Sequence, residues 1–232
     1  MCIRDSTKLE TLADDMISVL KETIAEGEFD GGAVMMMNKA SMNFAGGAKI
    51  ANPAKLEKSI KSLLEMAQEK SSDVVDVNFN SESYDGISFH KINFSVPSDE
   101  EEVQKIFGDN ITIMVGIGTD SVYLCGGSDP LPLLKASIEK SKTAGELESL
   151  NQYNAFLTPI LRFASGVTPE PALEKMADTL EESGKDRISV FSDVIENGIE
   201  SRLEMEDGIL ALIQAGFEAA QAGAFQGDVD EF

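Results

Sequence analysis

The chain carries few side chains with which to do acid–base chemistry. It has one histidine, His90, and two cysteines, Cys2 and Cys125. General acid–base catalysis and most transition-metal sites favour imidazole, and no second histidine is present to assist the first. We therefore expect His90 to be an ordinary surface or bulge histidine, and the composition favours a protein that is not an enzyme.

The stretch LCGGSDP at residues 124–130 looks most like a reactive site. It places Cys125 at the end of an expected strand, two glycines after it, and then a helix start. A thiolate near a helix N-terminus can have a lowered pKa, which makes Cys125 the candidate reactive thiol. A glycine-rich turn there can also bind phosphate, although Asp129 would repel an anion. Because neither a Gly-Lys-Ser/Thr motif nor an obvious base accompanies the turn, the sequence favours a capped turn with a small buried cysteine.

The methionine-rich stretch VMMMNKASMNF at residues 34–44 has three interpretations. Thioethers bind Cu(I), but neighbouring side chains of a strand point to opposite faces and cannot converge on one ion. Packing in the core is the simplest interpretation, and an adaptable apolar groove for a lipid or peptide is the second. The groove would be lined by Met35, Met37, Met42 and Phe44. We expect no metal and no cofactor.

The net charge narrows the class of partner. The chain has 19 Lys and Arg against 41 Asp and Glu, a net charge of −22. A surface this acidic repels phosphate backbones, so we expect no nucleic-acid partner. Acidic clusters at 73–76, 98–102 and 228–231 lack the spacing of a calcium loop and are expected to be solvated. No apolar run is long enough to cross a bilayer, so we expect no membrane span.

Two extended segments followed by a helix recur along the chain. The first helix should bury a stripe of five apolar residues: Leu9, Leu12, Met16, Leu20 and Ile24. The next should begin with Asn52 as N-cap and Pro53 in the first turn. Two-residue turns between alternating strands indicate antiparallel pairing. The sequence therefore predicts an α+β fold, in which strand-strand-helix units build a meandering antiparallel sheet with its helices packed on one face.

Two of the strand pairs permit sharper predictions. Asn197-Gly198 favours a type I′ hairpin turn, which would place Val190 opposite Met205 and Asp193 opposite Arg202. In the segment 87–96 the apolar alternation slips between Phe89 and Ile92, which predicts a bulge near His90.

The first six residues, MCIRDS, resemble the translated end of a transposon used to prepare sequencing libraries. On this interpretation residues 1–6 are an artefact that packs against nothing, and the chain is an N-terminally truncated fragment. We expect a single α+β domain over residues 7–225, with a division into two lobes near residue 145 as the alternative. Residues 226–232 would form an acidic tail.

Two stretches, ENGIESRLEMEDGIL and FDGGAVMMMNKA, resemble uncharacterised secreted or envelope proteins of planctomycete-type bacteria. The resemblance implies an exported protein and identifies no catalytic residues. Our leading hypothesis is a non-enzymatic binding module of the bacterial envelope or exterior, with a lipid, a peptide or a protein as partner. A structural or assembly subunit acting through protein–protein contacts is the alternative, and an enzyme or redox protein acting through Cys125 is the third hypothesis.

Overall fold

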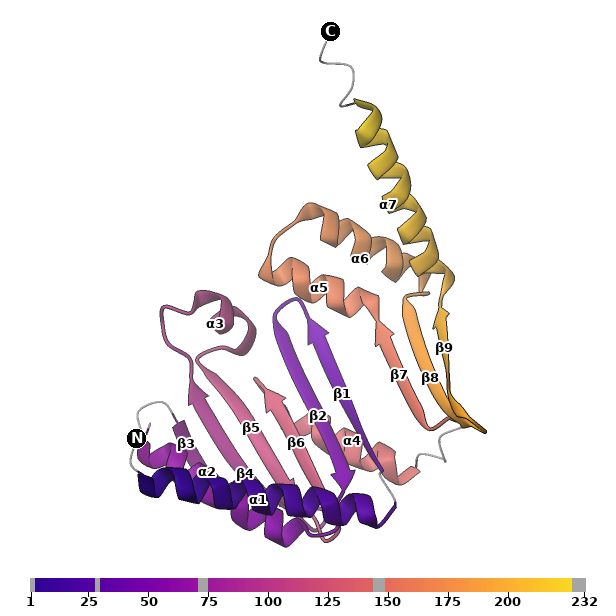
Figure 1. Cartoon of the computed structure of the whole chain (residues 1–232). Coiled ribbons are helices and arrows are strands. Elements are labelled where there is room, and N and C mark those ends of the chain that lie inside the picture. The colour runs from indigo at the N-terminus through magenta and orange to yellow at the C-terminus, as the bar shows by residue number, and fades with distance from the viewer. Residues whose placement is uncertain (1–2, 28–29, 71–74, 144–148, 227–232) are drawn as a thin grey trace. The chain divides into compact units, whose positions relative to one another are not determined.

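The computed structural model describes residues 3–27, 30–70, 75–143 and 149–226 (Figure 1). Contacts divide the chain into two compact units. Unit 1 comprises Met1–Met36 and Ala40–Ala144, and unit 2 comprises Met37–Lys39 and Gly145–Phe232. None of the helices in the described ranges is both long and apolar enough to cross a bilayer.

Unit 1 is built on a six-stranded sheet in the order β1-β2-β6-β5-β4-β3. Consecutive strands from β3 to β6 form a meander, and β2 joins it by pairing antiparallel with β6. The expected α+β class with an antiparallel sheet is confirmed. The elements of this unit are α1 (Ile3–Ala25), β1 (Gly31–Asn38, of which the last two residues belong to unit 2), β2 (Ser41–Lys49), α2 (Pro53–Lys70), β3 (Val75–Tyr84), β4 (Ile87–Ser95), α3 (Glu101–Phe107), β5 (Asn110–Ile117), β6 (Ser121–Gly127) and α4 (Leu131–Thr143).

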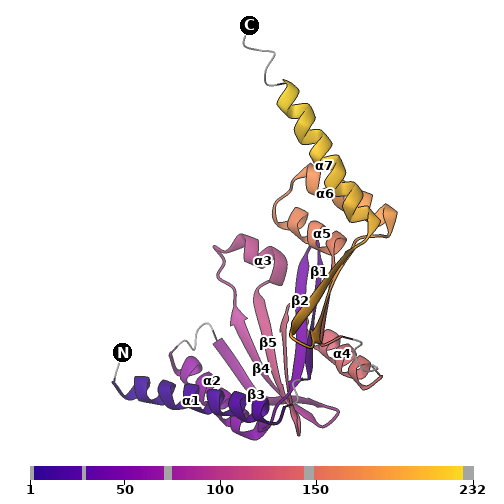
Figure 2. The ribbon, with the colours of Figure 1, turned by 45° about the vertical axis from the view of Figure 1, so that its right-hand side comes forward.

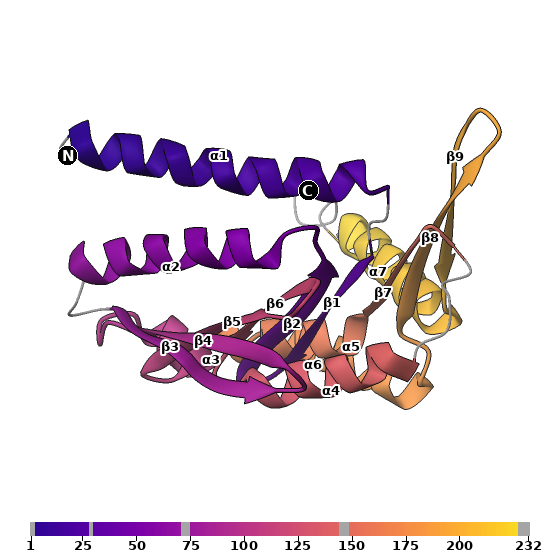
Figure 3. The same ribbon diagram turned by 90° about the horizontal axis from the view of Figure 1, so that it is seen from below.

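The helices of unit 1 pack on both faces of this sheet, where the sequence pattern suggested one. Leu134 and Ile138 of α4 lie in one buried cluster with Phe89, and Ile60 and Leu64 of α2 pack on a second cluster that includes Ile92. Phe89 and Ile92 therefore point to opposite faces of β4. Figure 3 shows α2 lying over the sheet and α1 lying over α2.

The alternation slip in β4 has a different cause from the predicted bulge. β4 pairs with β5 residue by residue from Ser88 to Ser95 without a shift in register. The slip instead marks the point at which the covered face changes. The bulge lies on the neighbouring strand β3, between Asn78 and Glu82, where Asn80 has a φ of 50°.

The start of α2 follows the prediction, but the packing of α1 does not. Asn52 Oδ1 accepts a hydrogen bond from the Lys55 backbone N–H at 3.1 Å, which confirms the N-cap. The buried residues of α1 are Val19 and Thr23, whereas most of the expected apolar stripe is exposed. Lys55 of α2 lies within salt-bridge distance of two carboxylates of α1, so the face of α1 that carries these carboxylates lies against α2.

Unit 2 has a three-stranded antiparallel sheet in the order β7-β8-β9. Its core forms where Leu161, Ala177, Leu180 and Ile209 of the three helices pack with Ile188 of β8. Figure 2 shows the β8–β9 hairpin leading directly into α7. The elements are β7 (Asn151–Phe156), α5 (Leu157–Val167), α6 (Pro171–Ser183), β8 (Arg187–Ile195), β9 (Gly198–Met205) and α7 (Asp207–Gln226).

The β8–β9 hairpin turns one residue earlier than predicted. Ile195 pairs with Gly198, so Glu196 and Asn197 form the turn, and neither has a positive φ. A type I′ turn requires positive φ at both central residues, so the type I′ prediction was wrong. Val190 consequently faces Leu203 and Asp193 faces Glu200. The error displaces each partner by two positions, which leaves every side chain on its expected face.

The prediction that residues 1–6 pack against nothing cannot be compared with the structure. Cys2 and the side chains of residues 3–6 lie outside the described residues, as do residues 227–232 of the expected acidic tail.

Candidate functional site

The candidate reactive thiol, Cys125, lies in β6 within the core of unit 1. Its side chain is 0% exposed and belongs to the cluster that contains Phe89 and Met114. Burial raises the pKa of Cys125 to about 12. A thiol that is both buried and protonated is a weak nucleophile, so this environment favours the structural interpretation of LCGGSDP.

The groove candidates lie on the β1–β2 hairpin. The positions next to Gly31 and Gly46 are occupied by Ala48 and Ala33, respectively. Continuing this antiparallel register along the hairpin places Met35 beside Phe44. Strand alternation puts Met37 on the same face of β1 as Met35, and Met42 on the same face of β2 as Phe44. All four candidates therefore point to one side of the hairpin.

That side of the hairpin continues across β6 as an apolar surface. Phe44 pairs with Gly126, and its ring takes the space where a Cβ at that glycine would lie. Leu124, two residues earlier on β6, shares the face and is exposed. The cluster that α2 covers is centred on β3, β4 and β5. Met35, Phe44 and Leu124 lie on the same sheet outside this cluster.

The two edge strands of this sheet differ in chemistry. β1, with the sequence GGAVMMMN, contains neither a charged residue nor a proline, and Met35 and Met36 are 54% and 59% exposed. β3 at the other edge carries Asp76 and Glu82 and is distorted by the bulge. Charges and bulges are the features by which edge strands avoid pairing with other chains. β1 therefore has neither of the protections found on β3.

A buried polar cluster lies on the opposite half of the sheet, around His90. The expectation of an ordinary surface or bulge histidine was wrong as to its environment, because the side chain is 0% exposed. The bulge places the backbone N–H of Asn80 3.1 Å from His90 Nδ1, which accepts its hydrogen bond. Nε2 consequently carries the ring proton and donates a hydrogen bond to Glu57 Oε1 of α2 at 3.1 Å.

Glu57 links this histidine to Lys61, one turn further along α2. Lys61 Nζ lies 2.7 Å from the same oxygen, Oε1. The hydrogen bond from Lys61 holds the pKa of Glu57 below its usual range, so the carboxylate is ionised at neutral pH. Burial, with the nearby Lys61 charge, lowers the pKa of His90, so its imidazole is neutral.

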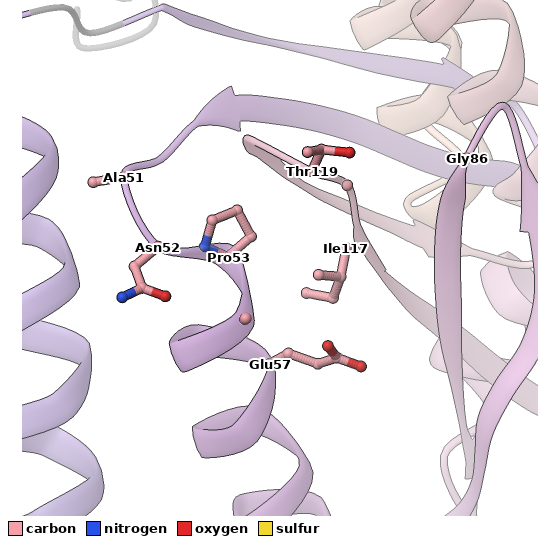
Figure 4. Close-up of a pocket in the computed structure, with 9 residues that line it drawn as sticks. Ala51, Asn52, Pro53, Glu57, Gly86, Ile117 and Thr119 are labelled. Atoms are coloured by element: carbon pink, nitrogen blue, oxygen red, sulfur yellow. The ribbon is translucent and has the colours of Figure 1, made fainter.

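Glu57 also lines an open pocket of about 490 Å³ (Figure 4). The start of α2 forms one wall, and the β3–β4 and β5–β6 turns supply Gly86 and Thr119. Figure 4 shows Glu57 extending from α2 toward the side on which Ile117 and Gly86 lie. The volume of the pocket falls within the range of small-molecule sites. The complete lining is Ala51, Asn52, Pro53, Ala54, Glu57, Gly86, Ile117, Gly118 and Thr119.

The sequence offered only partial signals for this site. Glu57 and Lys61 are spaced as an i,i+4 ion pair on one helix face, which could have been recognised. Their contact with His90 depends on a bulge, which was predicted near His90 but lies on β3, and on the packing of α2 over β3 and β5, which was not predicted. Within the described ranges, no group of three or more His, Cys, Asp or Glu residues is placed to hold a metal ion.

Comparisons with known proteins do not assign this chain to a family. No protein-family model matches it, and neither the curated proteins nor the solved structures include a significant match.

Proposed function

We propose that the chain is a non-enzymatic binding module of the bacterial envelope or exterior, and that β1 of unit 1 is where it binds. The single observation that supports this proposal is the uncharged edge strand itself, with Met35 and Met36 exposed on its two faces. An exposed apolar edge is a template for pairing with another strand. In this proposal an extended segment of a partner protein or peptide extends the sheet beside β1.

A polypeptide fits this edge better than a lipid does. An edge strand presents backbone N–H and C=O groups, and a lipid tail supplies no partners for them. An added strand would satisfy these groups, while its alternate side chains contact the two faces of β1. Methionine suits such a contact because its flexible thioether adapts to different apolar shapes.

The extracytoplasmic location is part of the proposal and rests on the resemblance to secreted planctomycete-type proteins. The net charge of −22 adds a preference for partner segments that carry basic residues beside their apolar ones, because opposite charge accelerates encounter.

The proposal can be tested with an array of synthetic extended peptides that alternate apolar and polar residues. We expect the full chain to bind a subset of them, and Met35→Lys to weaken binding by at least about tenfold because it places a charge in the contact. Ser83→Lys is the matched control, since it adds the same charge to the opposite edge strand, β3. Equal loss in both variants, or no bound peptide at all, would contradict the proposal.

A second candidate, an assembly subunit, is favoured by a different observation. The exposed face of α1 carries five large apolar side chains: Leu9, Met16, Ile17, Leu20 and Ile24. Apolar helix faces of this kind pair with other helices in bundles. This candidate predicts that the molar mass measured by light scattering rises with protein concentration, and that Leu20→Glu returns the chain to a monomer.

A further inference from the structure

The two oxygens of the Glu57 carboxylate differ in their hydrogen-bond partners. His90 Nε2 and Lys61 Nζ both contact Oε1, at 3.1 Å and 2.7 Å. Among the residues that the structure describes, none donates a hydrogen bond to Oε2. The side chain lines the pocket at the start of α2 (Figure 4). An ionised carboxylate oxygen is only an acceptor, so a donor is what it can bind.

We infer that this pocket binds an aliphatic cation, a primary ammonium or guanidinium group at the end of a short methylene chain, with Glu57 Oε2 as its acceptor. Such a group occurs in free amines and in Lys or Arg side chains, and the chemistry at the carboxylate is the same for both sources.

The charge of the pocket selects a cation. Glu57 is the only charged side chain among the nine lining residues, although Lys61, which does not line the pocket, pairs with its Oε1. The whole chain carries a net charge of −22. A charge-assisted hydrogen bond to a carboxylate is stronger than one between neutral groups. A neutral donor of the same shape would lose that advantage.

The size and walls of the pocket select an organic cation rather than a bare metal ion. Calcium requires six to eight oxygen ligands, whereas a single carboxylate lines this space. The volume of about 490 Å³ has room for a chain of several methylene groups. Ala51, Pro53, Ala54 and Ile117 supply the apolar wall against which those methylenes would pack.

The carboxylate is held in place before any ligand arrives. His90 is fully buried and fixed at both ring nitrogens, by Asn80 on one side and by Glu57 on the other. Lys61 holds the same oxygen of Glu57 from within α2. A side chain fixed in this way loses little conformational freedom on binding, which favours affinity.

The inference is independent of the proposed function, because no residue of β1 lines the pocket. The two can fail separately: Glu57→Gln should leave peptide binding at β1 unchanged, and Met35→Lys should leave cation binding unchanged.

Calorimetric titration of the full chain with agmatine and with cadaverine tests the inference, with pentanol as the uncharged comparison. We expect saturable binding of the two cations and none of the alcohol. Glu57→Gln keeps the shape of the side chain and an acceptor for His90 while it removes the charge, and we expect it to weaken binding by at least about tenfold. Glu65→Gln makes the same charge change on an exposed turn of α2 and should bind as the unmodified chain does.

A second variant tests whether Glu57→Gln weakens binding only through a change in structure. Ala54→Phe fills the pocket from its exposed wall and leaves the charge of Glu57 in place, and should also abolish binding. Equal affinity of the Glu57→Gln and Glu65→Gln variants, or retained binding in Ala54→Phe, would overturn the inference. Comparing agmatine with a blocked lysine and with a lysine-containing peptide identifies the source: tighter binding of the peptide indicates a partner side chain, and equal or tighter binding of the free amine indicates a small molecule.

Discussion

The His90 imidazole donates from Nε2 to Glu57 Oε1 across 3.1 Å, joining the interior of β4 to the first half of α2. The ring is neutral, and its second nitrogen accepts from the backbone of the β3 bulge. One side chain thus connects a helix, a strand and an irregularity in the neighbouring strand.

We predict that acid weakens the fold in two steps that begin at different pH values. The pKa of His90 is lowered from 6.5 on folding, so the unfolded chain takes up its proton first as the pH falls. The contribution of His90 to the free energy of unfolding is therefore fully present above pH 6.5, and it is lost as the pH falls from that value to the lowered pKa. The pKa of Glu57 is also lowered, from 4.5, so a second loss follows below that pH.

Urea denaturation of the chain and of His90→Gln across this pH range measures the first step. Because His90 is the only histidine, the variant should lose the decline that begins at pH 6.5 and keep the later one. Identical pH profiles for the two proteins would show that the histidine is not neutral in the fold.

Cys125 should resist alkylation as long as the protein is folded. Its pKa of about 12 and its burial leave almost no accessible thiolate near pH 8. We expect iodoacetamide to label the Cys125 peptide only after denaturant is added, as read by peptide mass spectrometry, which separates this residue from Cys2. Rapid labelling of the native protein would reopen a redox or nucleophilic role.

Gly116→Ala should destabilise unit 1. The added Cβ would lie 2.5 Å from Phe89 Cε1 and 2.9 Å from Ile87 Cγ2, in the fully packed cluster under α4. Overpacking of this kind costs about 1–3 kcal/mol. Gly32→Ala is the control, because its Cβ would meet no atom within 4 Å. Chemical denaturation of both variants gives the difference, and equal stabilities would contradict the packing described for Phe89.

Gly86→Ala tests the turn between β3 and β4. Asp85 and Gly86 have φ of 53° and 77°, the positive pair that a type I′ turn requires. An alanine at the second position should cost about 1–2 kcal/mol. Gly198→Ala, in a strand position without positive φ and with no atom near its Cβ, should change stability by less than about 0.5 kcal/mol. A reversed order of the two effects would place the type I′ turn where the sequence suggested it.

Local signals predicted the elements better than their contacts. The cap at Asn52, the strand pairs and the side on which each residue of β8 and β9 lies could be predicted because each depends on neighbours in the chain. The turn prediction at Asn197-Gly198 was wrong because Asn197 is the last residue of the turn and Gly198 is the first residue of β9. Asp85-Gly86 carries the equivalent signal and does form the positive-φ turn.

The candidate sites show the same division. Alternation alone places Met35 and Met37 on one face of β1, but the exposure of that face depends on where α2 ends over the sheet. The burial of His90 could not be predicted from its position between Phe89 and Lys91. It follows from a bulge on another strand and from a glutamate 33 residues away in the sequence.

The unequal edges of the six-stranded sheet also limit how far it can grow. A sheet with two undefended edges can recruit strands from both sides and propagate into a fibre. Here β3 carries charges and a bulge, and β1 carries neither. If a second copy were to pair through its own β1, both outer edges of the joined sheet would be copies of β3, and addition would stop there. The asymmetry therefore makes association at β1 self-limiting.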